Sequence, residues 1–393
     1  MAVKVEQFRD SQGLMQDLRD LPAGTVAIYT LVGDEKYRTI LVTPDVQKAY
    51  EYPIGAADLN RKILAFREAV QNPNLDPRPL GQELYKILLG NMAVDLQQAR
   101  AQTLMWSLDG TLRYVPLAAL FDGSRYLIEQ YGLSVFTPAS NARLKDPPDA
   151  RWTGVGFGVT KAHEGAVALP GVILELAGII HENGGPRGGV LEGDVRTDEA
   201  FTEQSMREEL RKRFTAVHIA SHFSFRPGDD TKSALLIGDG SNFTLAQMRK
   251  VPNLFGGVQI LTLSACNTGV GDNTGDGREV EGFGVLAQRQ GAKAVIASLW
   301  SVADASTSGL MQEFYRFRES AAGVTKLEAL RQAQLGFLRG NLNVPQSSTA
   351  DRSIHEALRK QTGGEWIPYP LDPKAPYAHP FYWAAFFLMG NWL

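Results

Sequence analysis

The part of the chain after residue 149 alternates between short apolar runs and amphipathic stretches, and this alternation restricts the fold more than any other feature. The apolar runs have the length of buried strands and occupy residues 153–160, 215–222, 258–266 and 292–300. The amphipathic stretches have helical spacing and occupy residues 171–181, 198–214, 280–289, 306–317 and 326–338. Strands that alternate with helices form parallel sheets, because each crossover returns the chain to the same end of the sheet. We therefore predict an α/β fold with a mostly parallel sheet flanked by helices.

The first part of the chain has a different rhythm. Residues 1–20 form a charged helical lead, and the runs at 25–32 and 37–43 flank a polar turn that is typical of a β-hairpin. Further helices are predicted at 56–70 and 79–89, and further strands near 104 and at 126–137. A proline-containing segment, 146–149, is the best candidate boundary. We divide the chain into the lead at 1–20, an N-terminal half at 21–148 and a C-terminal half at 149–393.

Two details of the C-terminal half are also predicted. Thr197 or Asp198 should cap the helix at 198–214, since both residue types accept hydrogen bonds from a helix N-terminus. The closing apolar run at 381–389 has the composition of a buried strand.

Charge and cysteine content narrow the class of protein. The formal net charge is −3 and there is no basic block, which argues against direct contact with nucleic acid. The N-terminus lacks the apolar core of a signal peptide, and no apolar stretch is long enough to span a bilayer. A single cysteine, Cys266, excludes an internal disulfide. We expect a cytoplasmic protein that contacts no membrane and keeps its thiol reduced.

Two of the apolar runs end in side chains that suit catalysis, His222 and Cys266. Functional groups gather beyond the carboxyl ends of the strands in an open parallel sheet, so the two would meet if their strands are neighbours. An imidazole raises the thiolate fraction of a nearby thiol and can protonate a leaving amine. Small neighbours such as Ser264 leave room for substrate, and the backbone N–H groups of Phe223 and Cys266 are candidates for an oxyanion hole.

Other interpretations of these residues stay open at this point. A lone cysteine is usually a small buried hydrophobe, and His218, on the same strand face as His222, is expected to be a core residue. The two histidines have the spacing of a zinc helix but no glutamate between them. Residues 269–275 are rich in glycine without the spacing of a nucleotide loop, and 272–277 imitate only the start of a calcium loop. We therefore predict no metal and no cofactor.

Six segments in the same order resemble the CHAT domain, a bacterial member of the caspase and separase superfamily of cysteine proteases. The matching segments are DGTLRYVPLAAL at 109–120, ALPG at 168–171, VHIASH at 217–222, LTLSACNTG at 261–269, GAKAVIASLWSVAD at 291–304 and HPFYWAAF at 379–386. The resemblance runs from about residue 20 to the end of the chain. It implies a caspase-like sheet, a nucleophile at Cys266, a catalytic histidine at His222, and a degenerate caspase-like N-terminal half without catalytic residues.

The sequence departs from the family pattern at two points that affect function. Phe223 stands where the residue after the catalytic histidine is usually glycine. Its side chain must point away from the substrate or narrow the pocket. The helical repeats that precede many CHAT domains are also missing, so regulation would come from an omitted segment, a regulatory protein or a separate repeat-containing chain.

The resemblance also suggests residues that contact substrate. Trp300 should flank the cleft, and an acidic residue near the position of Asp304 helps to bind arginine in the separase branch. Asp304 also suits the N-cap of the following helix, so an apolar specificity pocket is equally open.

The leading hypothesis is a cysteine endopeptidase that cleaves specific protein substrates in a regulated bacterial defence or signalling pathway. The family implies substrates such as a gasdermin-like pore former or a CRISPR-associated target. A catalytically idle interaction scaffold is the alternative, and a nucleotide-binding α/β protein is the third hypothesis.

Overall fold

One large sheet runs through the whole molecule in the computed structural model, which describes residues 11–149, 151–182, 188–224, 226, 229–264, 278–300, 304–342 and 367–393. Its twelve strands, in spatial order, are β3 (Gln47–Tyr52), β2 (Tyr37–Val42), β1 (Thr25–Val32), β4 (Thr103–Ser107), β5 (Gly132–Val135), β15 (Phe386–Gly390), β14 (Ala294–Ser298), β13 (Ile260–Ser264), β9 (Ala216–Ala220), β6 (Thr153–Gly158), β8 (Leu191–Thr197) and β7 (Ile180–His181). The hairpin β1–β2, strand β3 and the β14–β15 pair are antiparallel, and all other neighbours are parallel. The predicted mostly parallel α/β sheet is confirmed.

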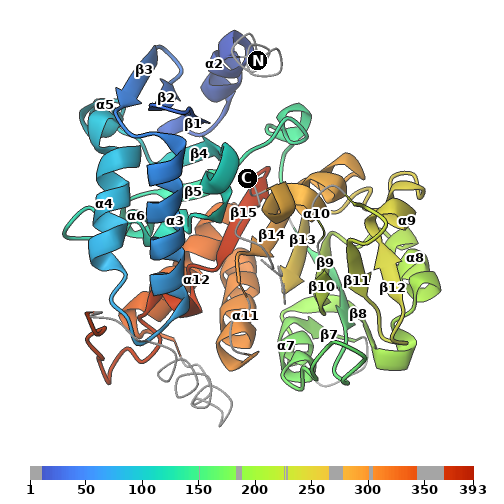
Figure 1. The fold of residues 1–393 in the computed structure, drawn as a ribbon. Coiled ribbons are helices and arrows are strands. Elements are labelled where there is room, and N and C mark those ends of the chain that lie inside the picture. Colours follow the sequence, from blue (N-terminus) through green and yellow to red (C-terminus); the bar gives the residue numbers. More distant parts are fainter. Residues whose placement is uncertain are drawn as a thin grey trace.

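Helices cover both faces of the sheet (Figure 1). They are α2 (Ser11–Asp20), α3 (Ala56–Gln71), α4 (Arg78–Leu88), α5 (Ala93–Gln98), α6 (Leu127–Gln130), α7 (Val172–Ile179), α8 (Glu203–Arg211), α9 (Leu245–Arg249), α10 (Arg278–Arg289), α11 (Asp304–Ser320) and α12 (Lys326–Arg339). A small antiparallel sheet of β10 (Phe223–Ser224), β11 (Ala234–Leu236) and β12 (Asn242–Thr244) lies beside the C-terminal half.

The two faces of β9 and β13 meet different helices because successive side chains on a strand point in opposite directions. Val217, Ile219, Leu261 and Leu263 belong to a core formed with α8, α9 and α10. Residues at even positions of these strands face α7 and α11 instead, as Ala220 does by packing on Val172 and Leu176 of α7. All five residues of each strand are buried, which explains why both strands appear as continuous apolar runs.

Strand β15, near the C-terminus of the chain, lies between the two halves of the sheet (Figure 1). It pairs antiparallel with β14 over five residues and parallel with β5 at Leu388↔Ser134 and Met389↔Val135. One sheet therefore contains strands from both sides of residue 149. The division into halves at 21–148 and 149–393 stays a prediction about chain segments.

Several local predictions were wrong, each for an identifiable reason. The predicted strand at 126–137 is split into helix α6 and strand β5, and the closing run begins with a 3-10 turn, Pro380–Tyr382, before β15 starts at Phe386. Helix α8 is capped by Thr202, because residues 198–200 form a separate 3-10 turn. Strands β3 and β8 were missed because both are mostly polar and have few buried positions.

Candidate active site

Strands β9 and β13 are parallel neighbours, as the sequence hypothesis requires. Their register pairs Ile260 with Ala216 and ends with Ser264 opposite Ala220. His222 follows Ala220 by two residues, and Cys266 follows Ser264 by two residues in the sequence. Cys266 itself lies outside the described residues, so its predicted role stays a prediction.

His222 is half-buried and forms hydrogen bonds with two other segments of the chain. Its ring Nε2 lies 2.8 Å from the carbonyl oxygen of Val167. Its main-chain carbonyl accepts a hydrogen bond from the N–H of Leu236 over 2.9 Å. A carbonyl oxygen can only accept, so Nε2 carries the hydrogen and Nδ1 of the neutral ring is the acceptor. This tautomer is the one that can take a proton at Nδ1.

Val167 lies in a loop that is closed at its base. Leu169 N–H donates to the carbonyl of Thr160 over 3.0 Å. The carboxylate of Asp198 accepts from the Thr160 N–H at 2.8 Å and from its hydroxyl at 2.6 Å. Asp198 has a φ of +46°, a left-handed conformation that aspartate tolerates better than most residues. The Val167 carbonyl is therefore presented to His222 by an anchored loop.

Phe223, the residue after His222, belongs to the core. It lies on β10 opposite Leu235, its side chain is 2% exposed, and its ring centroid is 5.1 Å from that of Phe283. The bulky side chain is thus accommodated by packing. The oxyanion role predicted for the backbone N–H groups of Phe223 and Cys266 stays a prediction.

Three further residues were predicted to contact substrate. Ser264 is 1% exposed, and its hydroxyl donates to Glu175 Oε1 over 2.5 Å. Trp300, just past β14, is buried, and its indole Nε1 donates to the carbonyl of Phe381 over 3.1 Å. Helix α11 begins at Asp304, whose side chain lies outside the described part of the chain. All three roles stay predictions.

A buried polar network, which the sequence interpretation missed, lies beneath the ends of β9 and β13. Glu175 Oε1 accepts hydrogen bonds from Ser264 and from Nε2 of His218, the latter over 2.9 Å. The hydroxyl of Tyr315 lies 3.3 Å from His218 Nδ1 and 3.0 Å from Thr262 Oγ1. Burial raises the pKa of Tyr315, so its hydroxyl keeps its proton. The expectation that His218 is a hydrogen-bonded core residue agrees with this environment.

Glu175 left one signal in the sequence. It is the only charged residue in the apolar stretch that forms α7, Val172–Ile179. A helix with so few charges is normally buried, and a lone carboxylate in it requires a partner.

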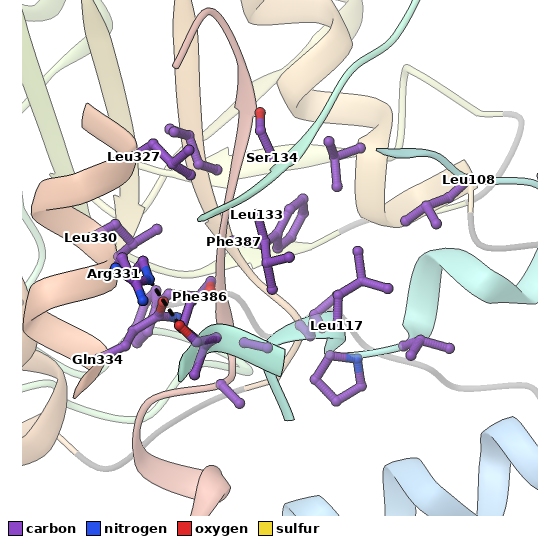
Figure 2. Close-up of a pocket in the computed structure, with 18 of the residues that line it drawn as sticks. Leu108, Leu117, Leu133, Ser134, Leu327, Leu330, Arg331, Gln334, Phe386 and Phe387 are labelled. Carbon is purple, nitrogen blue, oxygen red and sulfur yellow. Dashed lines mark hydrogen bonds between the residues drawn. The ribbon is translucent and has the colours of Figure 1, made fainter. Parts of the chain in front are cut away.

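A small pocket lies away from His222, at the seam between the N-terminal half and β15 (Figure 2). Its lining is mainly apolar and includes Leu117, Leu133, Leu327, Leu330 and Phe387. Its volume of about 30 Å³ has room for about one or two water molecules. We interpret it as a packing gap at the seam and not as a substrate site.

Two negative findings apply to the described ranges only. No helix there has the length and apolar character needed to cross a membrane. No group of three or more His, Cys, Asp or Glu side chains there is arranged to hold a metal ion. The calcium-like and glycine-rich segment at 269–277 lies outside those ranges.

The family is decided by a sequence model of the CHAT domain, which matches residues 78–391. The chain belongs to the CHAT domain family. No curated protein matches this CHAT chain in sequence. The family predicted from the six sequence segments is therefore confirmed.

The CHAT chain is similar in fold to separase. Two crystal structures of the Saccharomyces cerevisiae separase–securin complex match it with TM-scores of 0.54 and 0.52 at 10% identity, covering 99% and 96% of this chain. A crystal structure of gingipain R, an Arg-specific cysteine proteinase, matches with a TM-score of 0.43 at 10% identity and covers 86% of this chain and 75% of that one. The chain spans about a third, 31%, of the separase chains. The match to separase supports the caspase-like α/β fold that the resemblance implied.

Proposed function

We propose that this CHAT domain is a cysteine endopeptidase that uses Cys266 as nucleophile and His222 as base. The observation that carries the proposal is the parallel register of β9 and β13, in which Ala220 and Ser264 form the last pair. His222 and Cys266 each follow that pair by two residues. The bond from His222 Nε2 to Val167 supports the same proposal, since it leaves Nδ1 as the proton acceptor.

The proposed reaction has two stages. In the first, Nδ1 of His222 takes the thiol proton, the sulfur of Cys266 bonds to the substrate carbonyl carbon, and the C–N bond breaks as Nδ1–H protonates the leaving amine. In the second, His222 takes a proton from water as the water oxygen bonds to the thioester carbon, and the C–S bond then breaks to give the carboxylic acid product and the thiolate of Cys266. The backbone N–H groups of Phe223 and Cys266 are proposed to stabilise the oxyanion in both stages.

The substrate is proposed to be a specific protein, cleaved in a regulated bacterial defence or signalling pathway in the cytoplasm. The support is membership of the CHAT family. Ser264 is proposed to contribute through its main chain, because its hydroxyl is bound to Glu175. Trp300 and Asp304 are proposed to flank the cleft beyond β14.

Regulation is proposed to involve a second protein. The two similar separase structures are complexes in which separase is bound to securin. For this chain, a regulatory protein or a separate repeat-containing chain is the corresponding proposal.

The test combines cleavage of a proteome-derived peptide library with alkylation of Cys266 by iodoacetamide. Because Cys266 is the only cysteine, the alkylation rate reports on that thiol alone. We expect Cys266→Ala and His222→Ala to abolish cleavage. His222→Ala should also lower the alkylation rate near pH 6.5 by about tenfold or more, since an isolated thiol with a pKa near 8.5 is then almost fully protonated.

The control is His181→Ala on strand β7, three strands from β9 in the sheet order. This variant should keep wild-type cleavage and alkylation. Full cleavage by either dyad variant would refute the proposal. No cleavage by the wild type, together with alkylation that does not depend on His222, would favour the idle scaffold.

A further inference from the structure

The buried network around Glu175 joins the two strands that carry the proposed dyad. Glu175 comes from α7, His218 from β9 and Ser264 from β13, and each is at most 4% exposed. The single oxygen Oε1 of Glu175 accepts from both His218 and Ser264. One carboxylate therefore ties together two neighbouring strands and the helix that covers them.

The position of this link along the strands gives it a specific role. The β9–β13 ladder pairs Thr262 with His218 and ends at Ser264 opposite Ala220. Ser264 precedes Cys266 by two residues, and His218 precedes His222 by four. Within the strands, side chains at even spacing share one face of the sheet, so His218 and Ser264 face Glu175 of α7. Glu175 thus bridges the two strands at the end of the ladder, just before the chain reaches the proposed dyad.

The His218 ring is held from both sides. Nε2–H donates to Glu175, and Tyr315 of α11 contacts Nδ1 at 3.3 Å. Tyr315 also contacts Thr262 at 3.0 Å, and both Tyr315 and Thr262 are fully buried. The network therefore links α7 and α11 to both strands, and all of its side chains are buried.

The burial of Glu175 is unusual for a charged residue. Ile173 and Leu174, which directly precede it in the sequence, are 56% and 71% exposed, while Glu175 is 4% exposed. A helix of this composition would gain more hydrophobic stabilisation by burying the apolar residues, and burial of a carboxylate costs several kcal/mol unless partners compensate. Stability alone gives no reason for a carboxylate at this position.

We propose that Glu175 is a positioning residue, which fixes the ends of β9 and β13 through His218 and Ser264 so that His222 and Cys266 meet in reactive geometry. The proposal rests on the proposed protease function. Displacement of a reacting group by about 1 Å can cost a hundredfold in rate, so a link of this kind has a measurable effect without touching substrate.

The test compares two replacements of Glu175 by alkylation of Cys266 with iodoacetamide across pH 5–10, in the full chain. Glu175→Gln keeps an amide oxygen that can accept from His218 and Ser264. Glu175→Leu has similar volume and no acceptor. We expect the Gln variant to stay within about 1.5-fold of the wild-type rate. The Leu variant should be about tenfold slower near neutral pH, with its pH profile moved towards that of an isolated thiol.

A matched control is Glu209→Leu on α8, which covers the opposite face of the sheet. Glu209 is also 4% exposed and is bound by Arg196 at 2.6 Å and Lys212 at 2.8 Å. Its replacement should lower the melting temperature without changing the alkylation profile. If Glu175→Leu does not fold, Ser264→Ala replaces it, with an expected loss of about threefold.

The outcomes separate this proposal from the proposed function. If His222→Ala slows alkylation and folded Glu175→Leu does not, the positioning role is refuted and the dyad stands. If His222→Ala has no effect, the dyad itself fails. If Glu175→Gln and Glu175→Leu lose reactivity equally, or if Glu209→Leu gives the same change in profile, the positioning role by hydrogen bonding is refuted.

Discussion

Lys326 has its amino group buried in the interior of the protein. Its side chain is fully buried at the first turn of α12, and Nζ donates to Asn391 Oδ1 over 3.0 Å. Burial, then repulsion by Lys293 and Arg318, lowers the pKa of Lys326 from near 10.5 to about 7. The positive end of the helix dipole also disfavours its charge. The folded state is therefore stabler when Lys326 is neutral.

This shift predicts a pH-dependent stability. Below about pH 7 the ammonium is charged in both the folded and the unfolded chain, and the folded state carries the full cost of burial. Between about pH 7 and 10.5 the unfolded chain binds a proton that the folded chain has released, so Lys326 adds up to ~1.4 kcal/mol per pH unit to the free energy of unfolding as pH rises.

Lys326→Met should accordingly raise the melting temperature at pH 6, and the gain should shrink by pH 9.5. Asn391 Oδ1 keeps a second donor in this variant, the N–H of Leu393 at 3.1 Å. Thermal unfolding of both proteins across this pH range is the measurement. Equal destabilisation by Lys326→Met at both pH values would contradict the prediction.

The sequence could predict His222 and Cys266 as candidates because each ends an apolar run, and strand ends are where sheets present functional groups. It could not predict which residues Glu175 and Tyr315 bind. Both lie on helices, and their partners on β9 and β13 are at least 43 residues away in the chain. The charge of Glu175 favours the surface, whereas its position beside Val172, Leu176 and Ile179 is on the buried stripe of α7, and only the packing of α7 on the sheet shows which prevails.

At the scale of elements, long periodic stretches were predictable and their ends were not. The strands that became β1, β2, β6, β9 and β14 are apolar enough to be recognised alone. Strand β8 has one fully buried residue and reads as a polar loop until it pairs with β6. The start of α8 was misplaced because Thr197, Asp198 and Thr202 are all good capping residues, and only the backbone selects among them.

The cap of α8 can be tested by a matched pair of substitutions. Thr202 Oγ1 accepts from the N–H of Ser205 over 3.1 Å, and the Ser205 hydroxyl accepts from the N–H of Thr202 over 2.9 Å. Thr202→Ala should lower the free energy of unfolding by about 1 kcal/mol, since it leaves a helix N–H without its acceptor. Thr197→Ala removes no cap bond and should cost less than about 0.5 kcal/mol. Chemical denaturation measures the free energy of unfolding of both variants. A larger decrease for Thr197→Ala than for Thr202→Ala would contradict the assignment of Thr202 as the cap.

For the whole molecule, the decisive feature is that the sheet is completed by a strand near the end of the chain. Strand β15 contacts β14 of the C-terminal half and β5 of the N-terminal half. The parallel fold could be predicted from the strand–helix alternation, but the place of β15 could not. Insertion of the last strand in mid-sheet depends on contacts with residues more than 240 positions earlier, such as the Asn391–Arg143 bond.

Asn391, the residue after β15, fastens this junction. It is fully buried, and its Nδ2 donates to the carbonyls of Arg143, Leu144 and Asp146 at 2.7, 3.2 and 2.9 Å. These carbonyls belong to the segment that connects the two halves of the chain. Its Oδ1 accepts from Lys326. Loss of the amide would leave three carbonyls and the amino group of Lys326 without this partner.

We therefore predict that Asn391→Ala lowers the free energy of unfolding by about 2–4 kcal/mol. The strands of both halves should lose the same amount of stability. Native-state amide hydrogen exchange provides the measurement, because core strands exchange through the largest cooperative unfolding unit. Amides of β4 and of β13 should show the same decrease, since β15 is a shared neighbour in one sheet. A decrease confined to β13 would mean that the N-terminal half unfolds independently, and the sheet would then be two cooperative units joined at β15.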